Sequence, residues 1–326
     1  MDLRRQRINM NIGLIDVDSH NYPNLPLMKL SAWHKQQGDK VEWYDPFTHY
    51  DKVYMSKVFT SSPDYSYVVN ADQVIRGGTG YAIHGAGGET YCKADDKPLP
   101  EAVEHIYPDY GLYGITDTAY GFLTRGCPRG CSFCIVGKKE GMRSRKVADL
   151  NEFWGGQKHI VLNDPNILAC KDWKDLLLQL KDSGAMIDFN QGLDARMLTE
   201  EKCMALDAIR IKEIHFAWDR YEDKNIILPK LKMFAEISKK KPHSHSAIVY
   251  VLVNHTSTFE QDLERIYTLR DIGYWAYVMI YDKDHCKDRY KDLQRWCNNR
   301  FVFAKCPRFE DYNKQQLKPT HQLSLF

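Results

Sequence analysis

The stretch Gly126-Cys127-Pro128-Arg129-Gly130-Cys131-Ser132-Phe133-Cys134 places three thiols at the spacing C-x-x-x-C-x-x-C. Because Pro128 and Gly130 disfavour a regular helix, we expect a loop that wraps around a bound group. A structural zinc site takes four ligands, commonly as two separated pairs, and the sequence has no second C-x-x-C pair. Three thiolates in one loop suit a cubane iron–sulfur cluster in which one iron has no protein ligand. The alternatives at this point are a partial zinc site and three unrelated thiols.

Length and charge restrict the class of protein. The 326 residues can bury a sizeable core, and the formal net charge of +2 gives no argument for a nucleic-acid coat or a membrane-surface protein. The nine cysteines are dispersed, which favours reduced thiols. Residues 1–18 lack the apolar core and cleavage site of a signal peptide, and no apolar run approaches the length of a membrane span. We therefore expect a cytoplasmic protein without a membrane partner.

Strand and helix patterns in residues 1–80 predict a small parallel, Rossmann-like α/β unit. The segments 11–18, 40–44, 52–59 and 73–78 have the length and composition of strands. Residues 23–37 carry apolar side chains at helical spacing and end before Gly38. The alternation of strands with crossover helices is typical of a parallel sheet. Residues 81–118 are rich in Gly, Pro, Asp and Tyr without periodicity, so we expect a linker or lid there.

Strand and helix patterns alternate six times between residues 119 and 300. The predicted strands are 119–124, 159–164, 186–190, 213–218, 247–253 and 275–281. The predicted helices are 147–154, 166–181, 199–208, 223–239, 257–270 (Ser257 as N-cap, with Glu260 at the capping-box position) and 287–296. A complete βα barrel has about eight such units. We therefore predict a partial (βα)6 barrel over 119–300, with a C-terminal extension and tail over 301–326.

Polar residues gather where these predicted strands end. In βα barrels the active site lies at the carboxyl ends of the strands. The second strand is followed by Asn163, Asp164, Pro165 and Asn166, and the third by Asn190, Gln191, Gly192, Asp194 and Arg196. The remaining strand ends carry Trp218, Asp219 and Arg220, then Asn254 and His255, and finally Tyr281 and Asp282. We expect a polar ligand across this end of the barrel.

The cysteine loop resembles the cluster loop of the radical S-adenosylmethionine superfamily. That signature has the same three-cysteine spacing with an aromatic residue just before the third cysteine, here Phe133. The loop also follows the first predicted barrel strand, so the resemblance covers roughly residues 115–300. Residues 1–80, with Gly77-Gly78-Thr79-Gly80, resemble a truncated form of the cobalamin-binding domain that precedes the barrel in one branch. Because this unit has room for three or four strands where that domain has about five, we expect a structural cap and no bound cobalamin.

The resemblance implies a [4Fe–4S] cluster on the catalytic and metal-binding residues Cys127, Cys131 and Cys134, with S-adenosylmethionine on the open iron. A flavodoxin- or ferredoxin-like one-electron reductant would drive its cleavage to methionine and a 5′-deoxyadenosyl radical, which takes a hydrogen atom from a substrate. The segment Asn163–Asn166 stands where the family usually has a Gly-Gly-Glu type sequence. The implied ligands are Asp164 and Asn166 for the amino group, Arg196 for the carboxylate, Gln191 or Asp194 for the ribose, and Val253, Asn254 and Phe133 for the adenine.

The end of the chain carries a candidate docking peptide. The polar tail from Tyr312 ends in Leu323, Leu325 and Phe326, and apolar residues on a flexible terminus often bind a partner. Gln322-Leu323-Ser324-Leu325-Phe326 resembles the pentapeptide with which bacterial proteins bind the DNA sliding clamp. The alternative is a tail that folds back onto the barrel. If it docks, DNA or a nucleotide becomes the candidate substrate, and a nucleic acid a candidate partner.

Two other functions stay open from the sequence. One is an iron–sulfur adaptor that docks through its tail without radical turnover, and the other is a zinc-stabilised α/β protein. We expect Cys92, Cys286, Cys297 and Cys306 to be free thiols rather than ligands of a second cluster. The sequence does not identify the substrate, the electron donor or the oligomeric state, nor whether S-adenosylmethionine is consumed or recycled.

Overall fold

The computed structural model describes residues 9–20, 22–84, 90–238 and 247–312. The chain divides into two compact units, Met1–Gln191 and Gly192–Phe326. This division falls between the third and fourth strands of the predicted partial barrel. The candidate docking peptide Gln322–Phe326 lies outside the described residues, so clamp binding stays a prediction from sequence.

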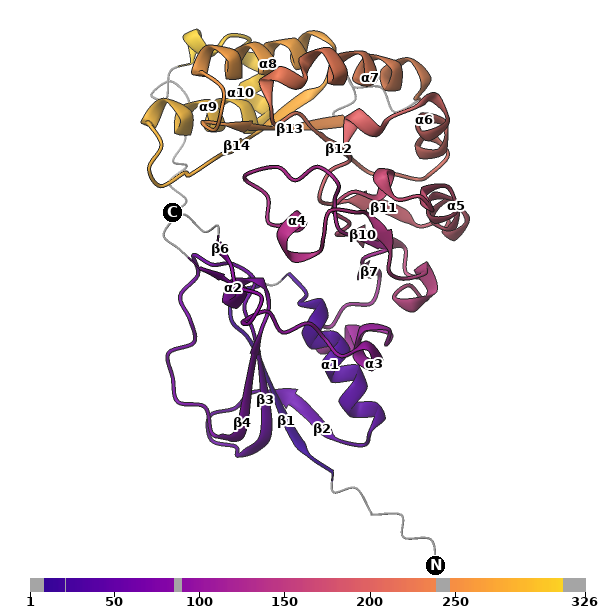
Figure 1. The fold of residues 1–326 in the computed structure, drawn as a ribbon, viewed down its shortest axis with the longest axis vertical. Coiled ribbons are helices and arrows are strands. Elements are labelled where there is room, and N and C mark those ends of the chain that lie inside the picture. Colours follow the sequence, from indigo (N-terminus) through magenta and orange to yellow (C-terminus); the bar gives the residue numbers. More distant parts are fainter. Residues whose placement is uncertain (1–8, 21, 85–89, 239–246, 313–326) are drawn as a thin grey trace, which may run out of the picture. The chain divides into compact units, whose positions relative to one another are not determined.

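A four-stranded parallel sheet forms the beginning of the first unit (Figure 1). Its strand order, β2-β1-β3-β4, matches the first four strands of the flavodoxin-like order. All four coincide closely with the strands predicted from sequence, so a small parallel α/β unit is confirmed. The strands are β1 (Asn11–Asp16), β2 (Lys40–Trp43), β3 (Tyr50–Ser56) and β4 (Ala71–Gly77).

Helix α1 (Leu25–Gln36) packs against this sheet and ends close to where the sequence predicts. The side chain of Asn24 caps it by accepting the N–H of Leu27, and Gly38 follows its end with φ +84°. Its apolar face joins a buried cluster of Ile12, Leu14, Leu27, Leu30 and Val103.

The prediction of a crossover helix between every pair of these strands is wrong. Residues 44–49 and 57–70 join β2 to β3 and β3 to β4 without a helix. The first connection needs none because β2 has four residues and is about 13 Å long, so six extended residues can run back along it.

The glycine-rich turn after β4 brings two stretches of backbone into close contact. Gly78 has φ +100°, and a Cβ at this position would lie 2.3 Å from the carbonyl oxygen of Lys57. The Lys57 N–H donates to the Gly77 carbonyl, and the Gly80 N–H donates to the Lys57 carbonyl. These glycines therefore allow the end of β3 to pack on the turn that follows β4.

A second parallel sheet in the first unit, of order β11-β10-β7, contains the first three predicted barrel strands. The two-residue strands β8 and β9 pair antiparallel and enclose the cysteine loop with helix α4. The elements are β7 (Thr118–Gly121), β8 (Thr124–Arg125), α4 (Val136–Lys139), β9 (Arg145–Lys146), η2 (Leu150–Glu152), β10 (His159–Leu162), η3 (Ile167–Ala169), α5 (Trp173–Ser183) and β11 (Met186–Phe189).

Two predicted helices in this region are wrong in extent. Residues 147–154 form just the single 3-10 turn η2, because Gly155 and Gly156 follow it and disfavour a longer helix. The helix predicted at 166–181 begins at Trp173, since the residues before it are taken up by the separate turn η3.

The second unit contains the other three predicted barrel strands in a parallel sheet of order β12-β13-β14. Figure 1 shows α7, α8 and α10 on one face of this sheet. The elements are η4 (Ala195–Met197), α6 (Glu200–Asp207), β12 (Ile214–Ala217), η5 (Tyr221–Asp223), α7 (Lys224–Ile237), β13 (Ala247–Val253), α8 (Phe259–Asp271), β14 (Trp275–Ile280), α9 (Asp288–Asn298), α10 (Arg300–Lys305) and η7 (Phe309–Asp311).

The helices of this unit agree with the prediction within two residues at their beginnings, but the capping box of α8 is shifted by one residue. Thr258 and Gln261 form it, rather than Ser257 and Glu260. The Ser257 hydroxyl donates to Asp262 instead, so it is not the helix cap. The two parallel sheets and their helices confirm an α/β protein.

Residues 81–118, predicted to be a linker or lid, contain short elements that pack on the first unit. Strands β5 (Ile83–His84) and β6 (Thr90–Tyr91) pair antiparallel. Helix α2 (Thr79–Ala82) precedes them, and α3 (Glu101–Glu104) and η1 (Tyr110–Tyr113) follow. Tyr110 is buried, and its hydroxyl donates to the Phe153 carbonyl at 2.7 Å, so this part of the segment is anchored.

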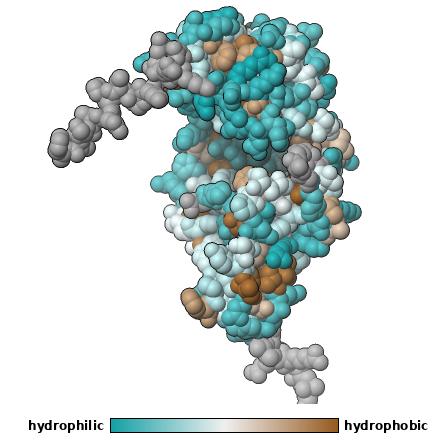
Figure 2. All heavy atoms as spheres, turned by 90° about the vertical axis from the view of Figure 1, so that its left-hand side faces the viewer, coloured by the Kyte–Doolittle hydropathy of each residue, from teal (hydrophilic) through white to brown (hydrophobic). Residues whose placement is uncertain are grey.

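The surface is largely hydrophilic on the face that Figure 2 presents, with one group of hydrophobic residues on the first unit. The most exposed large apolar side chains of that unit include Phe47, Tyr67 and Val68. No helix in the described part of the chain is both long enough and apolar enough to span a membrane.

We predict that Gly78→Ala destabilises the first unit more than Gly156→Ala does. Both glycines have φ +100°, but a Cβ at Gly156 has no atom within 4 Å, whereas one at Gly78 meets the Lys57 carbonyl. The left-handed conformation should cost each variant about 1–2 kcal/mol, and overpacking should cost Gly78→Ala a further 1–3 kcal/mol, roughly. Urea unfolding of both variants measures this difference. Equal losses would show that backbone conformation alone requires glycine at position 78.

Candidate functional site

A buried carboxylate holds the chain where it enters the cysteine loop. Asp164, just after β10, accepts hydrogen bonds from the Leu123 N–H at 3.1 Å and from the Thr124 N–H and hydroxyl at 2.5 and 2.6 Å. Burial raises the pKa of Asp164 to about 6, although these hydrogen bonds oppose the rise. Sequence analysis assigned this acid to a ligand amino group, and the structure places both of its oxygens on the loop backbone.

The loop is closed at its base by a second carboxylate. Glu140, at the end of α4, accepts from the Gly126 N–H at 2.9 Å and from Arg125 Nη1 at 2.8 Å. Gly126 has φ +84°, and a Cβ there would lie 2.3 Å from the Arg143 carbonyl. The two sides of the loop therefore approach each other closely at a position that only glycine fits.

The three thiols of the loop are all partly exposed. The Cys127 N–H donates to the Gly141 carbonyl at 3.1 Å, and the Cys134 N–H donates to the Cys131 carbonyl at 3.0 Å. Asn166 is buried, and its Nδ2 lies 3.5 Å from Cys127 Sγ, so an amide donor faces the first thiol. Phe133 lies in the same loop and is partly buried.

A tyrosine that sequence analysis did not select joins the polar residues at the ends of β10 and β11. The Tyr22 hydroxyl donates to Asn163 Oδ1 at 3.2 Å, and Asn190 Nδ2 donates to the same oxygen at 3.0 Å. Burial raises the pKa of Tyr22 to about 12, so it stays protonated at neutral pH. Tyr22 comes from the segment after β1, and its place beside Asn163 depends on a contact 141 positions apart in sequence. The neighbouring Gln191 is exposed.

In the second unit, Arg196 is held by two carboxylates. Its Nε donates to Asp194 at 2.7 Å and its Nη1 donates to Asp223 at 2.9 Å. Asp194 also caps the turn η4 by accepting the Arg196 N–H. The structure thus brings together two predicted ligand residues, Asp194 and Arg196, and adds Asp223, which the sequence gave no reason to select.

The backbone proposed for the adenine is engaged within the second sheet. The Val253 carbonyl accepts the Tyr281 N–H at 3.0 Å, and the Asn254 N–H donates to Asp262 at 3.2 Å. Asn254 has φ +61°, a conformation that asparagine tolerates better than most residues and that glycine adopts easily. Its side chain donates to the Tyr281 carbonyl at 2.9 Å, so this asparagine stabilises the turn itself.

A buried arginine organises the ends of β12 and β13. Arg265 has no exposed surface, and its guanidinium donates to the carbonyl oxygens of Trp218 at 2.6 Å and Leu252 at 2.7 Å and pairs with Asp262. The sequence contained a signal for this role. On α8, positions 262 and 265 share the helix face with the buried Phe259, Ile266 and Leu269, so two charged residues occupy core positions.

Asp219, at the end of β12, is the buried acid of this unit. Burial raises its pKa to about 6, while the charges of Arg265 and Arg196 oppose that shift. Its Oδ1 atom has no hydrogen-bond partner among the described residues. Sequence analysis placed Asp219 at a strand end, and the structure adds a polar atom there that a bound donor could satisfy.

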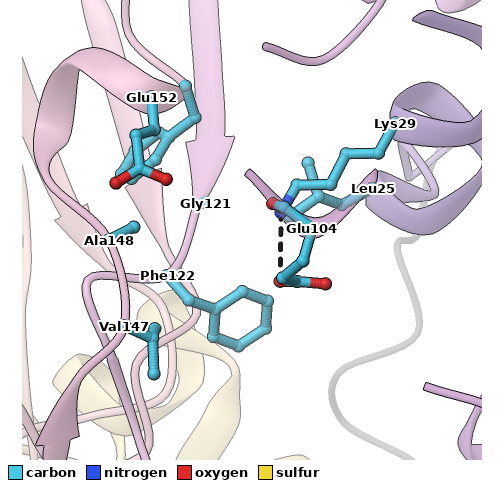
Figure 3. Close-up of a pocket in the computed structure, with 9 residues that line it drawn as sticks. Leu25, Lys29, Glu104, Gly121, Phe122, Val147, Ala148 and Glu152 are labelled. Atoms are coloured by element: carbon cyan, nitrogen blue, oxygen red, sulfur yellow. Dashed lines mark hydrogen bonds and ion pairs between the residues drawn. The ribbon is translucent and has the colours of Figure 1, made fainter. Parts of the chain in front are cut away.

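A small cavity in the first unit lies apart from these predicted site residues (Figure 3). Its volume of about 20 Å3 is enough for one water molecule. The Lys29–Glu104 ion pair and Glu152 contribute polar atoms to its wall. The cavity is therefore a hydration site between packed elements rather than a place for a substrate.

The cysteines after the predicted barrel lie at separate places. Cys286 donates to the Lys283 carbonyl, Cys297 to the Ala276 carbonyl, and Cys306 to the Arg308 carbonyl. Burial raises the pKa of Cys297 far above its usual range, so it stays a thiol. Cys92, in contrast, lies near His84 and Asp95.

We predict that Asp164 makes the protein less stable as pH rises from about 4 to about 6. The folded protein holds this proton more tightly than the unfolded chain, so folding is favoured where the carboxyl is protonated in both states. A pKa raised by about two units corresponds to roughly 3 kcal/mol. The difference in unfolding free energy between wild type and Asp164→Asn should therefore shift by that amount in favour of the variant over this range.

Asp149 provides the control for that measurement. Its carboxyl is exposed, and hydrogen bonding to Lys146 lowers its pKa, so Asp149→Asn should shift in the opposite direction. A pH-independent difference for Asp164→Asn would contradict the assignment of a raised pKa.

No protein-family model matches this chain, and no match was found among curated proteins.

Proposed function

We propose that this chain is a radical S-adenosylmethionine enzyme whose cluster is held by Cys127, Cys131 and Cys134. The observation that carries the proposal is the cysteine loop: three partly exposed thiols on one glycine-bounded loop, directly after the first strand of a parallel sheet. A [4Fe–4S] cluster with one iron free of protein ligands would supply the electron that cleaves S-adenosylmethionine to methionine and a 5′-deoxyadenosyl radical.

The spacing of the thiols supports a cluster over a single zinc ion. Among the described residues, the three Sγ atoms do not form a group whose ligand atoms all lie within 4.8 Å of one another. Ligands of one zinc ion must lie that close, because each is about 2.0–2.3 Å from the metal. Three thiolates that each bind a different iron of a cubane need a wider spacing, so the residues present fit a cluster.

The residues around the loop have distinct roles in this proposal. Asp164 and Glu140 fix the backbone on which Cys127 begins, so the thiol positions are set before a cluster binds. Asn166 Nδ2 donates to Cys127 Sγ, and such hydrogen bonds stabilise a thiolate and tune the reduction potential of a cluster. Partial exposure of the thiols leaves room for a ligand on the open iron.

We further propose that the two three-stranded sheets are consecutive parts of one partial (βα)6 barrel. Each sheet is parallel and its strands neighbour one another in chain order, as in a barrel. Leu193, four residues after β11, forms a parallel bridge with Phe216 of β12, and its N–H donates to the His215 carbonyl at 2.6 Å. The chain leaving β11 therefore runs alongside the next strand, as a continuous barrel requires.

Arg196 is the proposed cation for the carboxylate of S-adenosylmethionine. Asp194 and Asp223 hold its guanidinium in one orientation, which lowers the entropy lost when a ligand binds. Asp219, with its unpartnered Oδ1, is an acceptor at the end of the same sheet. The substrate that loses the hydrogen atom is not defined by these groups; DNA and nucleotides are the first candidates because of the terminal peptide.

We predict that replacing Cys127, Cys131 and Cys134 together by alanine abolishes the cluster. After anaerobic reconstitution, wild type should contain about four iron and four sulfide per chain, and the triple variant less than about one-tenth of that. Cys306→Ser is the matched control, because Cys306 is also partly exposed but donates to a backbone carbonyl elsewhere. An intact cluster in the triple variant would refute this assignment of the ligands.

We predict that Arg196→Ala weakens binding of S-adenosylmethionine at least about tenfold, as the loss of a charge-assisted hydrogen bond should. Iron content should be unchanged. Arg220→Ala is the control, since Arg220 is more than half exposed and pairs loosely with Glu222 in the same region. Equilibrium dialysis of the reconstituted protein measures both properties, and equal affinity in Arg196→Ala and Arg220→Ala would remove Arg196 from the proposed site.

Formation of 5′-deoxyadenosine decides between enzyme and adaptor. Reduced, reconstituted protein should release it from S-adenosylmethionine, with DNA and nucleotides tried as the first substrates. A protein that holds the cluster but neither binds nor cleaves S-adenosylmethionine would favour the adaptor.

A further inference from the structure

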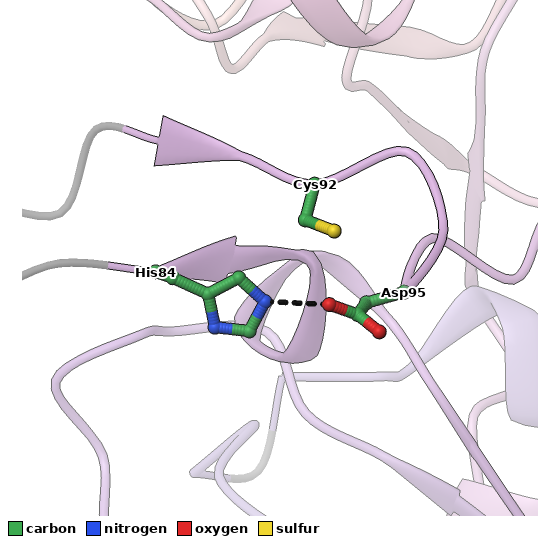
Figure 4. A group of neighbouring side chains, drawn as sticks. All are labelled: His84, Cys92 and Asp95. Atoms are coloured by element: carbon green, nitrogen blue, oxygen red, sulfur yellow. Dashed lines mark hydrogen bonds and ion pairs between the residues drawn. The ribbon is translucent and has the colours of Figure 1, made fainter.

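We propose that His84, Cys92 and Asp95 form a second metal site, separate from the cysteine loop, for a zinc-class divalent cation. Their ligand atoms all lie within 4.8 Å of one another. Figure 4 shows the imidazole of His84 and the carboxylate of Asp95 facing each other, with the Cys92 sulfur beside them. All three residues belong to the first unit, and the proposal does not depend on radical chemistry.

The pairing of β5 with β6 explains why two of the ligands meet. In this antiparallel ladder Ile83 lies opposite Tyr91, and the next backbone bond runs from the Cys92 N–H to the Ala82 carbonyl at 2.8 Å. Cys92 therefore lies opposite Ala82, two positions from His84. Side chains two positions apart along a ladder lie on the same face as diagonal neighbours. The imidazole and the thiol thus share one face of the hairpin.

A tight turn after β6 brings the third ligand to this face. The N–H groups of Asp95 and Asp96 both donate to the Cys92 carbonyl, at 3.2 and 3.3 Å. Asp95 Oδ2 lies 2.7 Å from His84 Nε2. Asp96 points elsewhere, because its carboxylate accepts from the Tyr91 hydroxyl at 2.8 Å. The turn therefore selects one carboxylate of the pair as a ligand.

The distances are close to those of a metal site. Bonds of about 2.0–2.2 Å at tetrahedral angles separate a nitrogen and an oxygen ligand by about 3.4 Å, and a sulfur ligand from either by about 3.6 Å. The histidine and the carboxylate now share a proton at 2.7 Å, so a metal that replaces this proton needs them to move apart by less than about 1 Å. Both side chains are about half exposed, which leaves them room for that movement.

The donor set selects the class of metal. A thiolate, an imidazole and a carboxylate suit zinc and other late first-row cations, whereas calcium and magnesium prefer oxygen ligands alone. Three protein ligands leave one tetrahedral position for water or an added ligand. Charge also favours a divalent ion, because the thiolate and the carboxylate together neutralise it.

Residue-specific alkylation tests the proposal on the full-length protein. In wild type, one equivalent of Zn²⁺ should slow alkylation of Cys92 by iodoacetamide at least about tenfold, as measured by peptide mass spectrometry. In His84→Ala and Asp95→Asn the added zinc should have little effect on Cys92. His105→Ala is the matched control: His105 also lies 2.7 Å from a carboxylate, that of Glu152, and is similarly exposed. It should behave as wild type.

A metal titration provides a second measurement. In the full-length variant with Cys127, Cys131 and Cys134 replaced by alanine, competition with a chromophoric zinc chelator should reveal about one site per chain. Adding Cys92→Ser should weaken this site more than about 100-fold, since loss of an outer partner alone costs about 10–100-fold. Co²⁺ should show a thiolate charge-transfer band that the same change removes. Zinc-independent alkylation of Cys92, or zinc binding unaffected by Cys92→Ser, would overturn the proposal.

Discussion

The hydrogen bonds from Leu123 and Thr124 to the buried Asp164 carboxylate are the constraint on which the cysteine loop depends. The chain leaves β7 at Gly121 and must turn into the loop while it keeps its buried N–H groups satisfied. Asp164, at the end of the neighbouring strand, accepts those groups. Burial of an acid is unfavourable, but three donors offset much of the loss of hydration. One side chain thus fixes the start of the loop relative to the sheet.

The second unit solves a similar problem with the opposite charge. Where β12 and β13 end, the carbonyls of Trp218 and Leu252 lack further strand partners, and the buried Arg265 donates to both. Asp262 balances its charge and also accepts the Asn254 N–H. In both units, therefore, a buried ionisable side chain replaces backbone pairing at the carboxyl end of a parallel sheet. These are the ends where polar residues for a ligand are expected.

The proposed zinc-class site and the cysteine loop show how spacing separates two kinds of metal chemistry. The ligand atoms of His84, Cys92 and Asp95 converge closely enough for one ion. The thiols of Cys127, Cys131 and Cys134 do not, which suits a polynuclear cluster. A short hairpin and turn can converge on a point because the side chains on one face are neighbours. A long loop held open by Glu140 and Gly126 instead surrounds a volume.

The sequence by itself determined the strands, most of the helices and the three-cysteine loop, because these follow from local periodicity and from spacing along the chain. It placed Asp164, Arg196 and Asp219 at strand ends, but their partners required the tertiary structure. Tyr22 reaches Asn163 across 141 positions, and Asp223 reaches Arg196 across 27. Cys92 looked isolated because His84 lies eight residues away, and only the antiparallel pairing of β5 and β6 brings the two side chains together. Local patterns decide which backbone forms, whereas hydrogen-bond partners and ligand sets depend on distances that arise after the sheets have assembled.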